Sequence, residues 1–341
     1  AGITVSVAAG NDGPDNDGLS GMGSSSLSVT VGATDDQNTI DRDDDTIAGY
    51  SSRGPRRDNG DSNPVNELKP DVTAPGSNII QAEGCVSSGG CNNNVPGQDA
   101  SSNDYTGRGS GTSYATPAVT GVISLVIEAN PDLHPLAIRE VLKQTAERRG
   151  EPTFPEIDPY WNKDFGWGMV DARAAVEMAI HLEDTGQSES IEWTLQTHVL
   201  NTTETGSKTV IEGHSWAIEG VVERVEYRLD TGDWQEVIYE EVDGEMTALE
   251  PFNWTLEINR KSLDQSNHTL EIRSASGSGT SIPVLLFIEG HGSESESDLL
   301  GIAISALSAI LVLSLVAVAA YRVLPTRNLD EPDIMDAEIV A

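Results

Sequence analysis

The first 183 residues combine short apolar runs with polar loops and then become helical. Alternating apolar and polar positions predict strands over 3–9 and 27–33. Longer apolar stretches predict helices over 115–129, 131–149 and 170–182, and the first of these is apolar enough to be buried. Strands and helices in this order are typical of an α/β domain, which we expect to occupy 1–183.

A different pattern follows the polar stretch 184–190, which we interpret as a linker. Short strand-like runs separated by turn residues occur at 191–200, 208–212, 223–230, 236–241, 252–258, 268–274 and 281–288. Seven such runs without a convincing helix predict an all-β sandwich over 191–288. This pattern resembles the immunoglobulin-like and fibronectin-like modules that are attached to secreted enzymes.

The third segment, 299–321, contains 23 residues without a charge. As a helix it would be about 34 Å long, enough to cross a bilayer core of about 30 Å. Its apolar residues cover every face, which favours a transmembrane helix over a buried soluble one. The preceding stalk 289–298 is acidic, whereas Arg322 and Arg327 follow the helix. The positive-inside rule therefore predicts a cytoplasmic tail at 322–341 and an extracellular location for everything before the helix.

Charge narrows the choice of partners. The chain has 55 acidic residues against 20 Lys and Arg, and its formal net charge is -35. Such a surface repels nucleic acid at every approach, so we expect no nucleic-acid partner. The excess is spread along the chain, a distribution that favours adaptation to a salty medium over a local binding patch.

Smaller features agree with an extracellular location. Cys85 and Cys91 lie six residues apart in a polar loop and could form a disulfide or stay as two free thiols. Three N-glycosylation acceptor patterns begin at Asn201, Asn253 and Asn267. Acidic clusters at 12–17 and 41–45 could bind Ca²⁺, but neither matches an EF-hand loop, so we predict no metal site and no required cofactor.

The strongest chemical signal is GTSYATP at 111–117. It directly precedes the apolar helix, so Ser113 is expected at or near a helix N-terminus. Unpaired backbone N–H groups and the positive end of the helix dipole stabilise a developing anion there. A nucleophilic serine would benefit from that position, although such a stretch by itself is more often only a helix cap.

The order of several motifs favours a catalytic serine over a simple helix cap. VAAGN at 7–11 is followed by SVTVGA at 28–33, YSSRGP at 50–55, KPDVTAPG at 69–76, GTSYATP at 111–117, and finally GWG and VDA within 166–172. This ordered set resembles the C-terminal half of the catalytic domain of subtilases, the subtilisin-like serine proteases. The resemblance implies a parallel sheet flanked by helices and an endopeptidase acting on proteins or peptides. It further implies Ser113 as the nucleophile, Asn11 in the oxyanion hole, and Ala8, Ala9 and Gly10 along the substrate pocket.

One part of the family pattern is missing. In subtilases the catalytic Asp and His motifs precede the asparagine motif, and only ten residues precede Asn11 here. We therefore expect this sequence to be part of a longer, membrane-anchored protease and to be inactive alone. A permuted triad of Asp184 or Asp230 with His291 is a weak alternative. A non-catalytic surface protein that retains a degenerate protease remnant is the alternative function.

Overall fold

The computed structural model describes residues 2–19, 21–61, 63–80, 108–238 and 251–292. The chain separates into two compact units, one formed by 1–258 with 268–288 and the other by 259–267 with 289–341. Cys85, Cys91 and the predicted segments 299–321 and 322–341 lie outside the described residues. Within the described part, no helix has the length and apolar character needed to span a bilayer.

A small, mainly parallel sheet forms the centre of the N-terminal part. Strand β2 (Val29–Asp35) pairs in parallel with β1 (Ser6–Ala8) and with β4 (Val72–Pro75), while the short β3 (Thr46–Ile47) pairs with it in antiparallel orientation. Two-residue strands β5 (Ile79–Ile80) and β6 (Arg108–Gly109) form a separate ladder. The predicted strand 3–9 is shortened because only three of its residues have a partner on β2.

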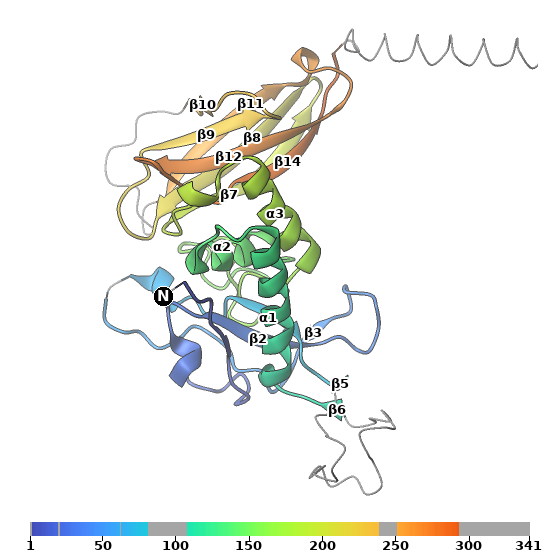
Figure 1. Cartoon of the computed structure of the whole chain (residues 1–341), viewed down its shortest axis with the longest axis vertical. Helices are drawn as coiled ribbons and strands as arrows, with labels where there is room; N and C mark the ends of the chain where they lie inside the picture. Colours follow the sequence, from blue (N-terminus) through green and yellow to red (C-terminus); the bar gives the residue numbers. More distant parts are fainter. Residues whose placement is uncertain (1, 20, 62, 81–107, 239–250, 293–341) are drawn as a thin grey trace, which may run out of the picture. The chain divides into compact units, whose positions relative to one another are not determined.

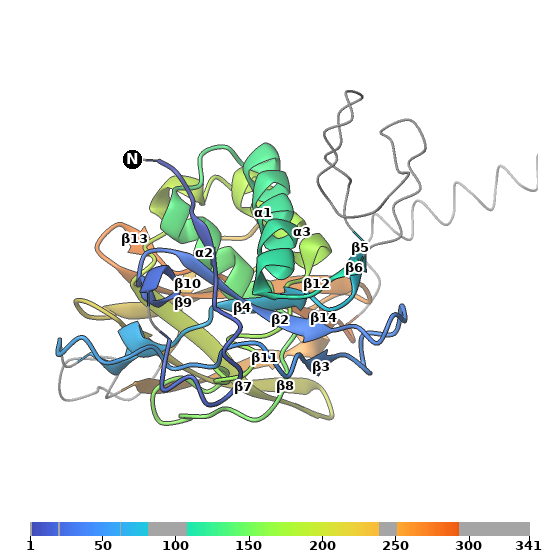
Figure 2. The same ribbon diagram turned by 90° about the horizontal axis from the view of Figure 1, so that it is seen from below.

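Three helices accompany this sheet: α1 (Thr112–Ala129), α2 (Pro135–Thr145) and α3 (Ala172–Asp184). All three start at a different residue from the one the apolar pattern predicts, and side-chain caps set the start of α2 and α3. His134 caps α2 and Asp171 caps α3, each by accepting a backbone N–H three residues further on. Figures 1 and 2 show α1 alongside β2, and it contacts β1, β2 and β4.

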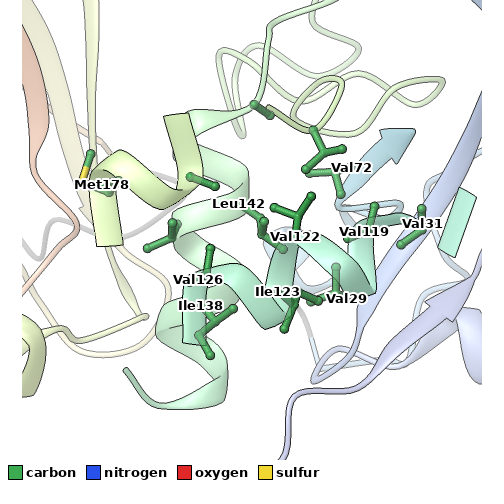
Figure 3. Packing of buried hydrophobic residues seen from close by; sticks show 14 of the residues in the cluster. Val29, Val31, Val72, Val119, Val122, Ile123, Val126, Ile138, Leu142 and Met178 are labelled. Carbon is green, nitrogen blue, oxygen red and sulfur yellow. The ribbon is translucent and has the colours of Figure 1, made fainter. Parts of the chain in front are cut away.

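The core lies between the sheet and the helices. Val29 and Val31 of β2 and Val72 of β4 face Val119 and other apolar residues of α1, as Figure 3 shows. The four named valines are each at most 1% exposed, so water is excluded from this face of the sheet. The buried run on β2 explains why its sequence is almost continuously apolar or small: a parallel strand covered on both faces has no solvent side.

Beyond α3 the described chain contains strands and short 3₁₀ turns. Strands β7 (Leu195–Thr205), β8 (Lys208–Ala217) and β11 (Phe252–Asn259) form one sheet. The other sheet contains β9 (Arg224–Leu229), β10 (Gln235–Glu236), β12 (Asn267–Ser276), β13 (Gly279–Thr280) and β14 (Val284–Glu289). Within this sheet, β9 and β10 pair as an antiparallel hairpin. The immunoglobulin-like interpretation and the domain boundaries stay predictions.

The stretch 184–190 is partly buried. Gln187 is 4% exposed and its side-chain amide donates to Glu271 of β12, with a separation of 3.0 Å, while it accepts from Arg273 at 2.9 Å. Glu271 also pairs with His181 of α3 at 2.9 Å and with Arg228 of β9 at 2.6 Å. A buried carboxylate with three partners ties the end of α3 to the strands that follow.

Two buried histidines lie opposite each other on β7 and β8. His198 and His214 are cross-strand partners, 2% and 8% exposed, and the rings of both lie about 5 Å from that of Trp216. Asp158 is the nearest carboxylate, 3.7 Å from His198. Burial, and secondarily the neighbouring His198, lowers the pKa of His214 to about 4.

We therefore expect acid to destabilise the fold through His214. Its pKa lies below the value of about 6.5 in an unfolded chain, so the unfolded state binds more protons and stability is lost as pH falls from 6.5 towards 4. The loss should reach about 3 kcal/mol at pH 4. The free energy of unfolding in urea is measured for the wild type and for His214→Phe at pH 7 and at pH 4. Equal pH dependence in both proteins would contradict this assignment.

Candidate active site

The loop that carries Asn11 starts at the carboxyl end of β1. Gly10 adopts a φ of +112°, a conformation that strains any other residue. The backbone N–H of Ser52 donates to the Gly10 carbonyl at 2.9 Å, and the Ser52 hydroxyl accepts the N–H of Asp12 at 3.1 Å. Both neighbours of Asn11 are therefore held by one serine of the YSSRGP motif.

Ser113 is the second residue of α1 and is exposed. Gly111 precedes the helix with a φ of +153°, and a Cβ there would lie 3.2 Å from the Asn11 amide nitrogen. Its N–H donates to the carbonyl of Gly76 at 2.9 Å, which fixes the start of the helix against the end of β4. Glycine at this position thus lets the helix end approach Asn11 closely.

Thr112 connects the two motifs. Its backbone N–H donates to Asn11 Oδ1 at 2.8 Å and its hydroxyl donates to the same oxygen at 3.0 Å. The same hydroxyl accepts the N–H of Gly10 at 3.2 Å. Because both donors engage Oδ1, the amide group is fixed with Nδ2 as its remaining hydrogen-bonding end. The sequence resemblance identified Asn11 and Ser113, but not the roles of Thr112 and Ser52, although both lie within recognised motifs.

This arrangement suits an oxyanion. Asn11 Nδ2 and the backbone N–H of Ser113 are donors at the end of the helix where the dipole is positive. An acyl-transfer reaction needs such donors beside the nucleophile, since negative charge develops on the carbonyl oxygen during attack. Ser113 is thus placed next to an anion-stabilising group.

Ala8, Ala9 and Gly10 line a cavity of about 500 Å³. Asp12, Met22 and Ser52 are among the other lining residues. The cavity adjoins the Asn11 loop and has small side chains along its β1 wall. The role of Ala8, Ala9 and Gly10 in substrate binding stays a prediction.

All six histidines of the chain lie among the described residues, and each is engaged elsewhere. His134 caps α2, His181 pairs with Glu271, His198 faces Asp158, His214 packs on Trp216, His268 bonds to Asp230 at 2.8 Å, and His291 contacts Arg260. Within the described residues, Ser113 therefore has no recorded imidazole partner to accept its proton.

The residues of the permuted alternative have other structural roles. Asp230 directly follows β9 with a φ of +53°, and its carboxylate is hydrogen-bonded to Nδ1 of His268 and to the N–H of Thr269. Asp184 is the last residue of α3. The structure thus gives no support to a triad built from these groups.

No metal centre is evident in the part of the chain that the structure covers. There, no group of three or more His, Cys, Asp or Glu side chains is placed to hold an ion. In the 41–45 loop, carboxylates instead bind local groups: Asp41 accepts the N–H of Asp43 at 3.0 Å, and Asp44 accepts the hydroxyl of Thr39 at 3.0 Å. The possible disulfide of Cys85 and Cys91 lies outside the described residues.

Comparison with known proteins places this geometry in a family context. The model of the subtilase family (peptidase S8) matches residues 1–168. Serine protease AprX of Bacillus subtilis is 39% identical over 176 residues, which are 52% of this chain and 36% of AprX. Subtilisin-like protease SBT3.12 of Arabidopsis thaliana is 36% identical over 140 residues, which are 38% of this chain and 16% of that protein.

Among solved structures, the serine protease of Aeromonas sobria in complex with its chaperone aligns with 84% of this chain and 61% of its own. The identity is 15% and the TM-score 0.40, so the assignment rests on the sequence matches and the ordered motifs. This chain spans about a third of AprX and a sixth of SBT3.12. On this basis, residues 1–168 are similar in sequence to the subtilase family, and the sequence matches support a subtilisin-like α/β fold for this region.

Proposed function

We propose that this chain is part of a serine endopeptidase in which Ser113 attacks the scissile peptide carbonyl. Asn11 Nδ2 and the Ser113 N–H would stabilise the oxyanion. The observation that carries the proposal is the double hydrogen bond from Thr112 to Asn11 Oδ1, because it fixes the free end of the Asn11 amide beside the start of α1. Proteins or peptides would be the substrates.

The base and its orienting carboxylate would come from elsewhere in a longer polypeptide. The curated relatives are much longer than the matched region, and the six histidines of this chain are engaged in other contacts. In subtilases the Asp and His motifs precede the asparagine motif. Ser113 would acquire its proton acceptor only in the complete catalytic domain.

The enzyme would act outside the cell, anchored to the membrane by 299–321. The uncharged run and the arginines that follow it support this location. The β-strand region would then stand between the catalytic domain and the membrane. Protein and peptide substrates and membrane lipid would be its partners.

Replacing Asn11 tests the proposed role of its amide as a donor to the oxyanion. In the protease purified from its source, Asn11→Ala should lower kcat by about 10²–10³ with KM little changed; this magnitude is the one known for subtilisin itself. The reason is that the amide donates only to the charge that develops during attack. The control is Asn59→Ala, which replaces an exposed asparagine in another loop, and peptide hydrolysis is measured for both variants. A changed KM at constant kcat would contradict the oxyanion role.

A further inference from the structure

The acceptor patterns for N-linked sugars are unevenly distributed. Residues 1–190 contain 13 asparagines, and none begins an Asn-X-Ser/Thr pattern. Residues 191–341 contain five, and three of them do: Asn201, Asn253 and Asn267, each with Thr at the third position. All three patterns therefore lie in the segment that has fewer asparagines.

All three asparagines are exposed in the structure. Asn201 lies on β7, Asn253 on β11 and Asn267 at the start of β12. On β11, buried residues alternate with exposed ones, so Asn253 and Thr255 both face solvent while Trp254 points inward. A strand places residues i and i+2 on the same face, so both polar side chains of the pattern lie on the outer side.

The position of two of these strands gives a physical reason for attaching sugars there. In the three-stranded sheet the order is β11-β8-β7, so β7 and β11 are its edges within the described part of the chain. An exposed edge strand can pair with another chain and cause aggregation, and proteins protect such edges with charged side chains or by covering them. Asn201 and Asn253 lie one on each edge strand.

We propose that Asn201, Asn253 and Asn267 are N-glycosylation sites, and that the sugars on Asn201 and Asn253 shield the two edges of this sheet. The proposal rests on the extracellular location given under the proposed function. A lipid-phosphate-linked oligosaccharide is the co-reactant. The asparagine Nδ2 forms a bond to C1 of the sugar, the bond from C1 to the phosphate oxygen breaks, the lipid phosphate leaves with the electron pair, and the amide loses one proton.

Mass spectrometry of the full-length protein purified from the membranes of its source tests this proposal. Peptides with Asn201, Asn253 and Asn267 should carry a mass increment of one or more sugar residues. The peptide with Asn259, which is exposed on the same strand as Asn253 but lacks the pattern, should not. Bare Asn201 and Asn253, or sugar on Asn259, would overturn the proposal.

Paired substitutions show whether a loss of sugar is due to the loss of the acceptor pattern or to misfolding. Asn253→Gln and Thr255→Val should each remove the increment from the β11 peptide, whereas Thr255→Ser should retain it because the hydroxyl stays. Peptide hydrolysis by the same preparations reports on Ser113 independently. A glycosylated protein without protease activity would therefore contradict only the proposed function, and an active protein without sugar only the present inference.

Discussion

The 341-residue chain, expressed by itself, is expected to cleave peptides no faster than its Ser113→Ala variant. Asn11 is bonded to Thr112, which directly precedes Ser113, but among the described residues the histidines contact other groups and none is seen to accept the Ser113 proton. In subtilisin, loss of the serine's base costs about 10⁶ in kcat, and we expect a deficit of that size relative to a complete subtilase.

The assay compares both proteins, purified in detergent at high salt, on the same peptide. Equal background hydrolysis agrees with a missing base. Cleavage by the wild type that is lost in Ser113→Ala would show that one of the six histidines reaches Ser113 in solution. Alanine substitution of each histidine would then identify it.

In the full-length protein purified from its source, we expect Ser113→Ala to lower kcat for peptide hydrolysis by about 10⁶. The substitution removes the hydroxyl that we propose as the nucleophile and should leave the helix intact, because Ser113 is exposed and makes no cap. Ser124→Ala is a matched control: Ser124 is an exposed serine on the same helix, with its hydroxyl bonded to the Thr120 carbonyl at 3.0 Å. It should keep full activity.

If Ser113→Ala kept a kcat well above this reduced value, another residue would be the nucleophile. Normal folding of the variant is checked by its unfolding temperature. A loss of activity in both variants would point to damage to α1 rather than to a chemical role of Ser113.

The α/β fold was predictable because its signals are local. The buried run of β2 and the apolar length of α1 are visible in the sequence, since a covered parallel strand and a core helix both need apolar residues. Boundaries were less accurate. Residues 3–5 are as strand-like as 6–8, but a strand also needs a partner, and the ladder with β2 begins at Ser6.

The site was predictable only in part, because it is made by contacts between distant residues. The resemblance supplied Asn11 and Ser113 as separate motifs. The bonds from Thr112 to Asn11 cross about a hundred residues, and Ser52 reaches the same loop from a third motif. Likewise, no local pattern showed that Gln187 in the presumed linker would bind Glu271 of β12. Local periodicity does not specify such pairings.

Covalent labelling of Ser113 tests the central claim most directly. The protein purified from its source is treated with a fluorophosphonate probe, which bonds to an activated serine, and the modified peptide is identified by mass spectrometry. We expect the label on the peptide of α1 that contains Ser113, and no label on Ser113→Ala. Label on another residue, or continued labelling of the variant, would contradict the account.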